Sequence, residues 1–157
     1  MTIESSNFVL FLMGPTASGK TELAIEISKI IDSKLISVDS ALIYKGMDIG
    51  TAKPDKKTLK KFPHELIDIC KPEDSFSVND FMKLATRHIE LAFDEGKLPI
   101  LVGGTSFYFN ALEHGLSSLP ASTDKSRKHF NNLLKKQGSE KLHTKLQKID
   151  PKSADRI

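Results

Sequence analysis

The sequence predicts an α/β fold in which helices flank a parallel sheet, with a helical appendage at the C-terminal end of this chain. Two observations predict it. Short apolar runs that end at glycine or aspartate alternate with segments whose apolar residues recur at helical spacing, as in chains that build a parallel sheet. Beyond residue 124 the helical spacing continues alone, without another candidate strand.

The first elements lie before residue 40. Residues 8–13 form a continuous apolar run that is typical of a buried parallel strand. Apolar residues at helical spacing then predict a helix over residues 23–31. Residues 35–38 predict a second strand that ends at Asp39.

The later elements of the core follow the same alternation. Ser77 and Asp80 have the spacing of a capping box, in a variant with the shorter acid, and therefore mark the start of a helix. The elements expected are a short strand at 66–69, a helix from Ser77 to Gly96, a strand at 99–102 and a short helix at 107–112.

Charge separates the core from the appendage. Residues 1–117 hold 13 lysines and arginines against 16 acidic residues, whereas residues 118–157 hold 10 against 4, a net charge of +6. The pattern changes at Leu119 and Pro120, and two helical stretches over 124–148 are separated at 137–139. The basic excess favours an anionic partner such as nucleic acid, and the alternative is a solvated helix face.

Several classes of protein are excluded or disfavoured by composition. No apolar run approaches the roughly 20 residues that cross a bilayer, so no membrane partner is expected. Residues 1–7 carry no targeting pattern. The lone Cys70 rules out an intramolecular disulfide framework and suits a reducing compartment, which predicts a cytoplasmic protein.

A phosphate-binding loop is the strongest motif in the chain. The segment fits G-x-x-x-x-G-K-[ST] between a strand and a helix, the context that a P-loop requires, and so refines the fold class to a P-loop NTPase-like sheet. Its glycines let several backbone N–H groups point at one anion, and the following helix adds the positive end of its dipole. The predicted phosphate-binding residues are Gly14, Pro15, Thr16, Ala17, Ser18, Gly19, Lys20 and Thr21.

The loop also predicts a magnesium site. Lys20 supplies a point charge to the phosphates, and the Thr21 hydroxyl is placed to hold Mg²⁺. The occupant stays open at this point, because a nucleoside triphosphate such as ATP and a prenyl diphosphate present the same oxygens.

A second candidate group follows the second and the last predicted strands, at the carboxyl edge where such sheets bind ligands. Asp39 can hold a metal, accept a proton from a nucleophile or cap a turn. The strand at 99–102 ends in Gly103, Gly104 and Thr105 instead of the acidic metal ligand common in NTPases, which weakens the interpretation as a kinase or motor.

Four segments resemble signature segments of the tRNA dimethylallyltransferase family. They are residues 14–21, 37–54, 63–68 and 101–112, in the family's order and spacing. Two positions depart from the family pattern: Leu42 stands where many members have Gln, and Ser106 stands where Gly or Met is common.

The resemblance implies transfer of a dimethylallyl group from dimethylallyl diphosphate to N6 of the adenine 3′ of the anticodon in tRNA. The phosphate loop would hold the diphosphate, Asp39 would act as the base, and Thr105 would contact the adenosine. Residues 1–117 would then be an incomplete P-loop core, and 118–157 the start of a basic tRNA-binding insertion domain. The tRNA-contacting residues implied are Asp39, Ser40, Ala41, Leu42, Thr105 and Arg127.

Two other functions compete with this one: a P-loop kinase for a nucleotide or small molecule, and a regulatory nucleotide-binding module. The resemblance also implies further chain that returns to the core and adds an arginine to the diphosphate. We therefore expect the 157 residues alone to be inactive. We expect the full-length protein to be a monomer.

Overall fold

The computed structural model describes residues 8–116 and 122–157 of the chain. It divides the chain into two compact units, Met1–Leu116 and Ser117–Ile157. The boundary expected between residues 117 and 118, the change of pattern at Leu119 and Pro120, and the start of the chain at 1–7 all lie outside the described residues.

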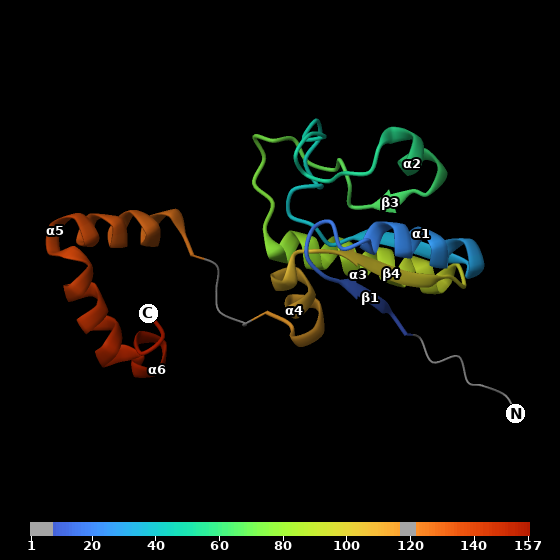
Figure 1. Cartoon of the computed structure of the whole chain (residues 1–157). Coiled ribbons are helices and arrows are strands. Elements are labelled where there is room, and N and C mark those ends of the chain that lie inside the picture. The colour runs from blue at the N-terminus through green and yellow to red at the C-terminus, as the bar shows by residue number, and fades with distance from the viewer. Residues whose placement is uncertain (1–7, 117–121) are drawn as a thin grey trace, which may run out of the picture. The chain divides into compact units, whose positions relative to one another are not determined.

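The first unit is built on a four-stranded parallel sheet, which confirms the predicted fold class (Figure 1). The spatial order is β1-β4-β2-β3, so the last strand in the sequence lies between the first two. The strands are β1 (Leu10–Met13), β2 (Ser33–Ser37), β3 (His64–Glu65) and β4 (Leu98–Gly103). This crossover brings the ends of β2 and β4 side by side, where ligands bind in parallel sheets.

Helices cover both faces of this sheet, because alternate side chains of a strand point to opposite faces. On one face Leu35, Ile100 and Val102 pack with Ala24 of α1 (Lys20–Ile30). On the other face lie α3 (Val78–Asp94) and α4 (Ser106–His114). The buried cluster there joins Ile36 and Leu101 of the sheet, with Val38 just after β2, to Phe81, Ala85, Tyr108 and Phe109 of these helices.

The predicted start of α3 is confirmed. The Asp80 backbone N–H donates to the Ser77 hydroxyl at 3.2 Å, and the Ser77 backbone N–H donates to an Asp80 carboxylate oxygen at 3.0 Å. Hydrogen bonds from Ser77 also lower the pKa of Asp80, so its carboxylate stays ionised at neutral pH. This reciprocal pair satisfies backbone donors that the first turn of a helix leaves free.

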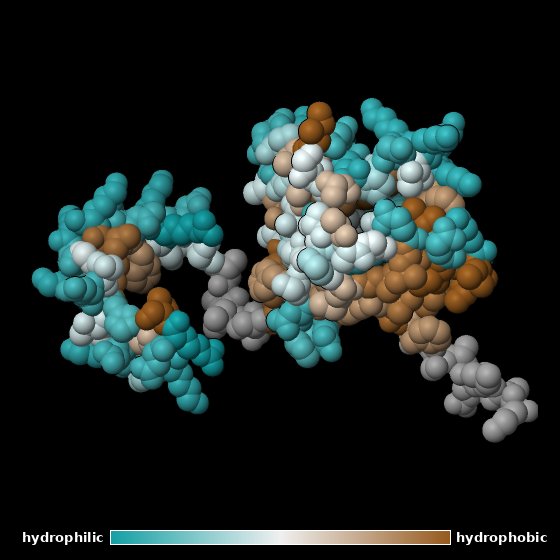
Figure 2. Space-filling view, in the orientation of Figure 1, coloured by the Kyte–Doolittle hydropathy of each residue, from teal (hydrophilic) through white to brown (hydrophobic). Residues whose placement is uncertain are grey.

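Two predicted strands differ in the structure. The prediction of a strand at 66–69 is wrong, since β3 is His64–Glu65. The strand ends there because Leu66 and Asp68 have φ of 65° and 55°, a left-handed backbone that a strand cannot contain. The strand expected to be buried at 8–13 is β1, which starts at Leu10 and lies at the sheet edge with Met13 exposed. Figure 2 shows apolar surface over this region and α1.

The described residues of the second unit form α5 (Asp124–Ile149) and the short α6 (Pro151–Ala154). The predicted break is confirmed at Gly138, whose φ of 79° and ψ of 168° interrupt α5. Such a backbone is essentially restricted to glycine. Among the described residues, no helix of either unit is long and apolar enough to span a bilayer.

Candidate functional site

A cavity of about 450 Å³ opens at the carboxyl edge of the sheet. The phosphate loop lines one side, and the ends of β2 and β4 line its floor. Another part of the lining is a segment of residues 51–55, which we call the far wall. Predicted site residues in the lining are Thr16, Ala17, Ser18, Gly19, Lys20, Thr21, Asp39 and Leu42.

The phosphate loop has the backbone expected of an anion-binding loop. Gly19 adopts a φ of 79° and directly precedes α1, whose start carries no side-chain cap. The first N–H groups of a helix without a cap are left for a ligand, and they lie at the positive end of the helix dipole. Gly14 and Pro15 line a neighbouring hollow together with Gly104.

Lys20 and Thr21 sit where this loop enters α1. The Lys20 ammonium donates to the Pro15 carbonyl and, at 3.3 Å, to the Ser18 hydroxyl, so its charge is held within the loop. The Thr21 side chain is half-buried and lines the cavity. Both side chains therefore lie within reach of an anion in the cavity.

Asp39 lies just beyond the end of β2, with Val38 between them. One oxygen of its carboxylate accepts from the Ala41 N–H at 2.8 Å and from the Leu42 N–H at 3.3 Å. Asp39 thus caps a turn, one of the roles its position allowed, and these bonds also fix the direction of the side chain. No group among the described residues donates to the second carboxylate oxygen, and Asp39 lines the cavity.

Gly103 and Thr105 bring the end of β4 against this turn. A Cβ on Gly103 would lie 2.0 Å from the Val38 carbonyl oxygen, so only glycine fits there. The chain then turns so that the Thr105 N–H donates to the same carbonyl at 3.2 Å. The Thr105 hydroxyl accepts from the Ser40 N–H at 3.0 Å, which joins two of the residues that the resemblance implied as tRNA contacts.

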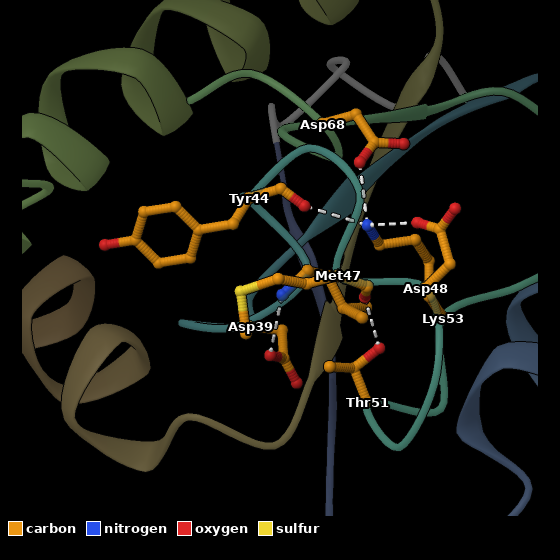
Figure 3. Close-up of polar contacts among 8 residues, drawn as sticks. Asp39, Tyr44, Met47, Asp48, Thr51, Lys53 and Asp68 are labelled. Atoms are coloured by element: carbon orange, nitrogen blue, oxygen red, sulfur yellow. Dashed lines mark hydrogen bonds and ion pairs between the residues drawn. The ribbon is translucent and has the colours of Figure 1, made fainter. Parts of the chain in front are cut away.

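The far wall was missed as part of the site. It lies between the turn at Asp39 and α2 (Lys56–Lys61), which Asp55 caps by accepting from the Thr58 N–H at 2.6 Å. Figure 3 shows the Lys53 ammonium inside this wall, approached by Tyr44, Asp48 and Asp68. The signal available in the sequence was the pair of charged residues Lys53 and Asp55 on either side of Pro54.

His64 is a second lining residue, and the sequence analysis assigned it no role. Its Nδ1 lies 2.8 Å from the Phe62 carbonyl oxygen, so that nitrogen carries the proton and donates. The other nitrogen is buried and has no hydrogen-bond partner among the described residues. Burial lowers the pKa of His64, and the bond to Phe62 opposes this only in part, so the ring is neutral at pH 7.

The donor set of the cavity fits a magnesium ion that is held mainly by a bound ligand. Among the described residues no cluster of three or more His, Cys, Asp or Glu side chains forms a metal site. Mg²⁺ usually keeps several waters and binds phosphate oxygens together with one or two protein oxygens. The Thr21 hydroxyl in the cavity matches this limited protein contribution.

Arg127 belongs to the second unit, near the start of α5. Its Nε donates to the Ser122 hydroxyl at 2.8 Å, and the Thr123 hydroxyl caps the helix. All ten lysines and arginines of residues 122–157 are exposed. None of them forms an ion pair with a carboxylate among the described residues. These charges are therefore available to an anionic partner.

Known proteins match the chain over most or all of its length. The sequence model of the family described as IPP transferase matches residues 42–157. Relatives described as tRNA dimethylallyltransferase, from Vesicomyosocius okutanii and Ruthia magnifica, are each 62% identical over 157 residues, which is 100% of this chain and 52% of the relative. The chain thus spans about half the length of the curated relatives it matches.

Solved structures also match the chain. The full-length tRNA isopentenylpyrophosphate transferase of Bacillus halodurans superimposes with a TM-score of 0.69 at 41% identity, over 97% of this chain and 50% of that one. A eukaryotic dimethylallyltransferase described as acting on tRNA gives a TM-score of 0.78 at 26% identity, over 97% of this chain and 38% of that one.

Proposed function

The chain belongs to the IPP transferase family, and from this premise we propose the reaction of the complete protein. It transfers the dimethylallyl group of dimethylallyl diphosphate to N6 of the adenine 3′ of the anticodon in tRNA and releases diphosphate. The observation that carries the proposal is one cavity with a phosphate loop on one side and a carboxyl side chain, that of Asp39, at its floor.

Departure of the leaving group is the step that the phosphate loop assists. The bond between the allylic carbon and its oxygen breaks with its electron pair going to diphosphate, so negative charge grows on the departing oxygens. The N–H groups at the start of α1 and the Lys20 ammonium face that charge. Fixed donors aimed at developing charge are usually the largest single contribution to catalysis.

A magnesium ion entering with the diphosphate, held in part by Thr21, would supply further charge neutralisation when bound. The residues of the chain would bind the diphosphate oxygens, hold the phosphate loop in position and keep the reacting carbon near the floor of the cavity. The ion is part of the proposal, as is its contact with the Thr21 hydroxyl.

Asp39 acts on the nucleophile. The new bond joins N6 of adenine to the allylic carbon, and the N6 proton passes to the Asp39 carboxylate oxygen that is not used in the turn. An exocyclic amine is a weak nucleophile, and a positioned base contributes typically 10²- to 10⁴-fold to such a step. Thr105, which is bonded to Ser40 beside this turn, would contact the adenosine.

The tRNA is held partly by the second unit. Turning an adenine out of its stack requires on the order of a few kcal/mol, which backbone contacts elsewhere must offset. The exposed basic side chains of residues 122–157, Arg127 among them, can supply such contacts electrostatically. Residues 39–42 would lie against the base, with Leu42 in place of the polar residue common in the family.

The test compares two donors in one assay with the full-length protein and bulk tRNA. Labelled dimethylallyl diphosphate is expected to label tRNA on adenine N6, and [γ-³²P]ATP is expected to label neither tRNA nor a small acceptor. Binding of both donors is measured side by side. Phosphorylation of an acceptor from ATP, with no prenyl transfer, would overturn the proposal in favour of a kinase.

A further inference from the structure

Among the described residues, the lysines that line the cavity are Lys20 and Lys53, and they differ in the partners of their ammonium groups. Lys20 donates only within its own loop, whereas the Lys53 side chain is 3% exposed and joins separate segments. The Lys53 ammonium donates to the Tyr44 carbonyl at 2.9 Å, to Asp48 Oδ1 at 3.0 Å and to Asp68 Oδ1 at 2.7 Å (Figure 3). An ammonium has three donors, and all are used. Lys53 therefore has none left for a diphosphate.

The three acceptors come from different parts of the first unit. Tyr44 follows the turn at Asp39, Asp48 lies between Tyr44 and Lys53 in the same loop, and Asp68 follows β3. Hydrogen bonds and the charges of Asp68 and Asp48 outweigh the burial of Lys53 and raise its pKa, so its ammonium persists at neutral pH. Lys53 thus closes the loop of residues 44–53 on itself and ties it to the segment after β3.

The loop and the segment after β3 need such a tie because each contains a residue with a strained backbone. Ala52, next to Lys53, has a φ of 56°, and Asp68 has a φ of 55°. Residues other than glycine hold such a backbone only where the surrounding structure over-determines it. The Thr51 hydroxyl adds one more bond, to the Met47 carbonyl at 2.8 Å. The far wall of the cavity is therefore fixed from within by polar contacts.

A short chain of contacts connects this cluster to the floor of the cavity. The Asp68 carboxylate binds Lys53, and the Asp68 N–H donates to the Leu42 carbonyl at 3.1 Å. The Leu42 N–H in turn donates to Asp39 at 3.3 Å. Asp68 is thus connected to Leu42, one of the two residues whose N–H groups fix the direction of the Asp39 carboxylate.

We propose that Lys53 is a positioning residue, which holds the far wall and, through Asp68 and Leu42, aims the Asp39 carboxylate at its substrate. The inference rests on the proposed function, because it assigns Lys53 to the half of the site that handles the nucleophile. The phosphate loop shares no hydrogen bond with this cluster among the described residues. Loss of Lys53 should therefore slow transfer without releasing the prenyl donor.

The experiment measures transfer and donor binding separately in the full-length protein. For Lys53→Met we expect kcat to fall roughly 10- to 100-fold, as small misplacements of reacting groups do. The Kd for dimethylallyl diphosphate should stay within about 3-fold, because that binding is made elsewhere. Lys53→Arg should recover part of the loss, since it keeps the charge. The matched control is Lys57→Met, which removes an exposed lysine of α2 and should change neither quantity.

A second pair of variants tests the role of Lys53 if Lys53→Met does not fold. Asp68→Asn weakens the acceptor connected to Leu42, whereas Asp48→Asn weakens an acceptor outside that connection; the two side chains are similarly exposed, at 41% and 49%. Asp68→Asn should lower kcat more. Equal effects, an unchanged kcat in Lys53→Met, no recovery in Lys53→Arg, or a matching loss of donor affinity would each overturn the inference. Absence of transfer by the wild-type protein would instead overturn the proposed function.

Discussion

The two units of the chain differ in how they use their residues. The first unit buries side chains on both faces of its sheet and surrounds the cavity with groups whose positions are fixed by hydrogen bonds. In the described part of the second unit only Ala154 is buried, and all ten basic side chains are exposed. Reaction chemistry depends on groups held within fractions of an ångström, whereas electrostatic binding of a polyanion depends mainly on charge. Changes in the first unit should therefore act on rate or folding, and changes in the second on affinity and its salt dependence.

The largest effect is expected at Asp39. Asp39→Asn keeps an oxygen that can accept from the Ala41 and Leu42 N–H groups but removes the base. The single-turnover rate of transfer by the full-length protein should fall roughly 10²- to 10⁴-fold. Donor affinity should stay the same. A normal rate would show that Asp39 serves only to cap the turn.

The next largest effect is expected on the folding stability of the first unit. Gly103→Ala places a Cβ against the Val38 carbonyl, while the neighbouring Gly104→Ala meets nothing closer than 3.4 Å. Overpacking of this kind typically lowers the free energy of unfolding by about 1–3 kcal/mol. Thermal or urea unfolding of both variants tests this, with Gly104→Ala as the control near zero. Equal free energies of unfolding for the two variants would contradict this prediction, because the end of β4 would then move away from Val38 without cost.

In the second unit the effect should be smaller and should depend on salt. Replacing Arg127 and Lys128, both exposed, by Gln should weaken tRNA binding and flatten the plot of log K against log salt. The slope should decrease by about 0.7–0.9 for each tRNA phosphate that the variant no longer neutralises. The rate at saturating tRNA should not change. A slope identical to that of the wild type would return this helix to the alternative of a solvated face.

A modest pH effect is expected from His64. Burial lowers its folded-state pKa below the ordinary value of 6.5, so the unfolded chain takes up the proton first as the pH falls. The contribution to stability is complete above pH 6.5 and is lost as the pH falls through the lower folded-state value. The free energy of unfolding measured against pH should show this loss in the wild type and a flatter curve in His64→Gln.

The sequence predicted those features that depend on local pattern. The phosphate loop needs its glycines and Lys20 at fixed spacing, and Ser77 with Asp80 determines the start of α3 within one turn. The positions of Asp39 and Thr105 followed from the rule that parallel strands end at one edge. The contact between Ser40 and Thr105 required the strand order as well.

Features that depend on distant contacts were not predicted. Residues 66–69 have the composition of a strand, but the left-handed backbone at Leu66 and Asp68 is stabilised by contacts with residues 42–45 and with Lys53. Lys53 looks like an ordinary surface lysine in the sequence. Its burial depends on acceptors 15 residues ahead and 9 residues behind, which no local pattern indicates.

The most direct test of the division between the units is a tRNA titration of the single-turnover rate, done in parallel for three full-length proteins. They are the wild type, Asp39→Asn, and the variant with Arg127 and Lys128 replaced by Gln. We predict that the double variant needs more tRNA but reaches the wild-type rate at saturation, whereas Asp39→Asn saturates at the wild-type tRNA concentration with a rate lower by roughly 10²-fold or more. A double variant that stays slow at saturating tRNA, or an Asp39→Asn protein that regains the wild-type rate there, would contradict the account.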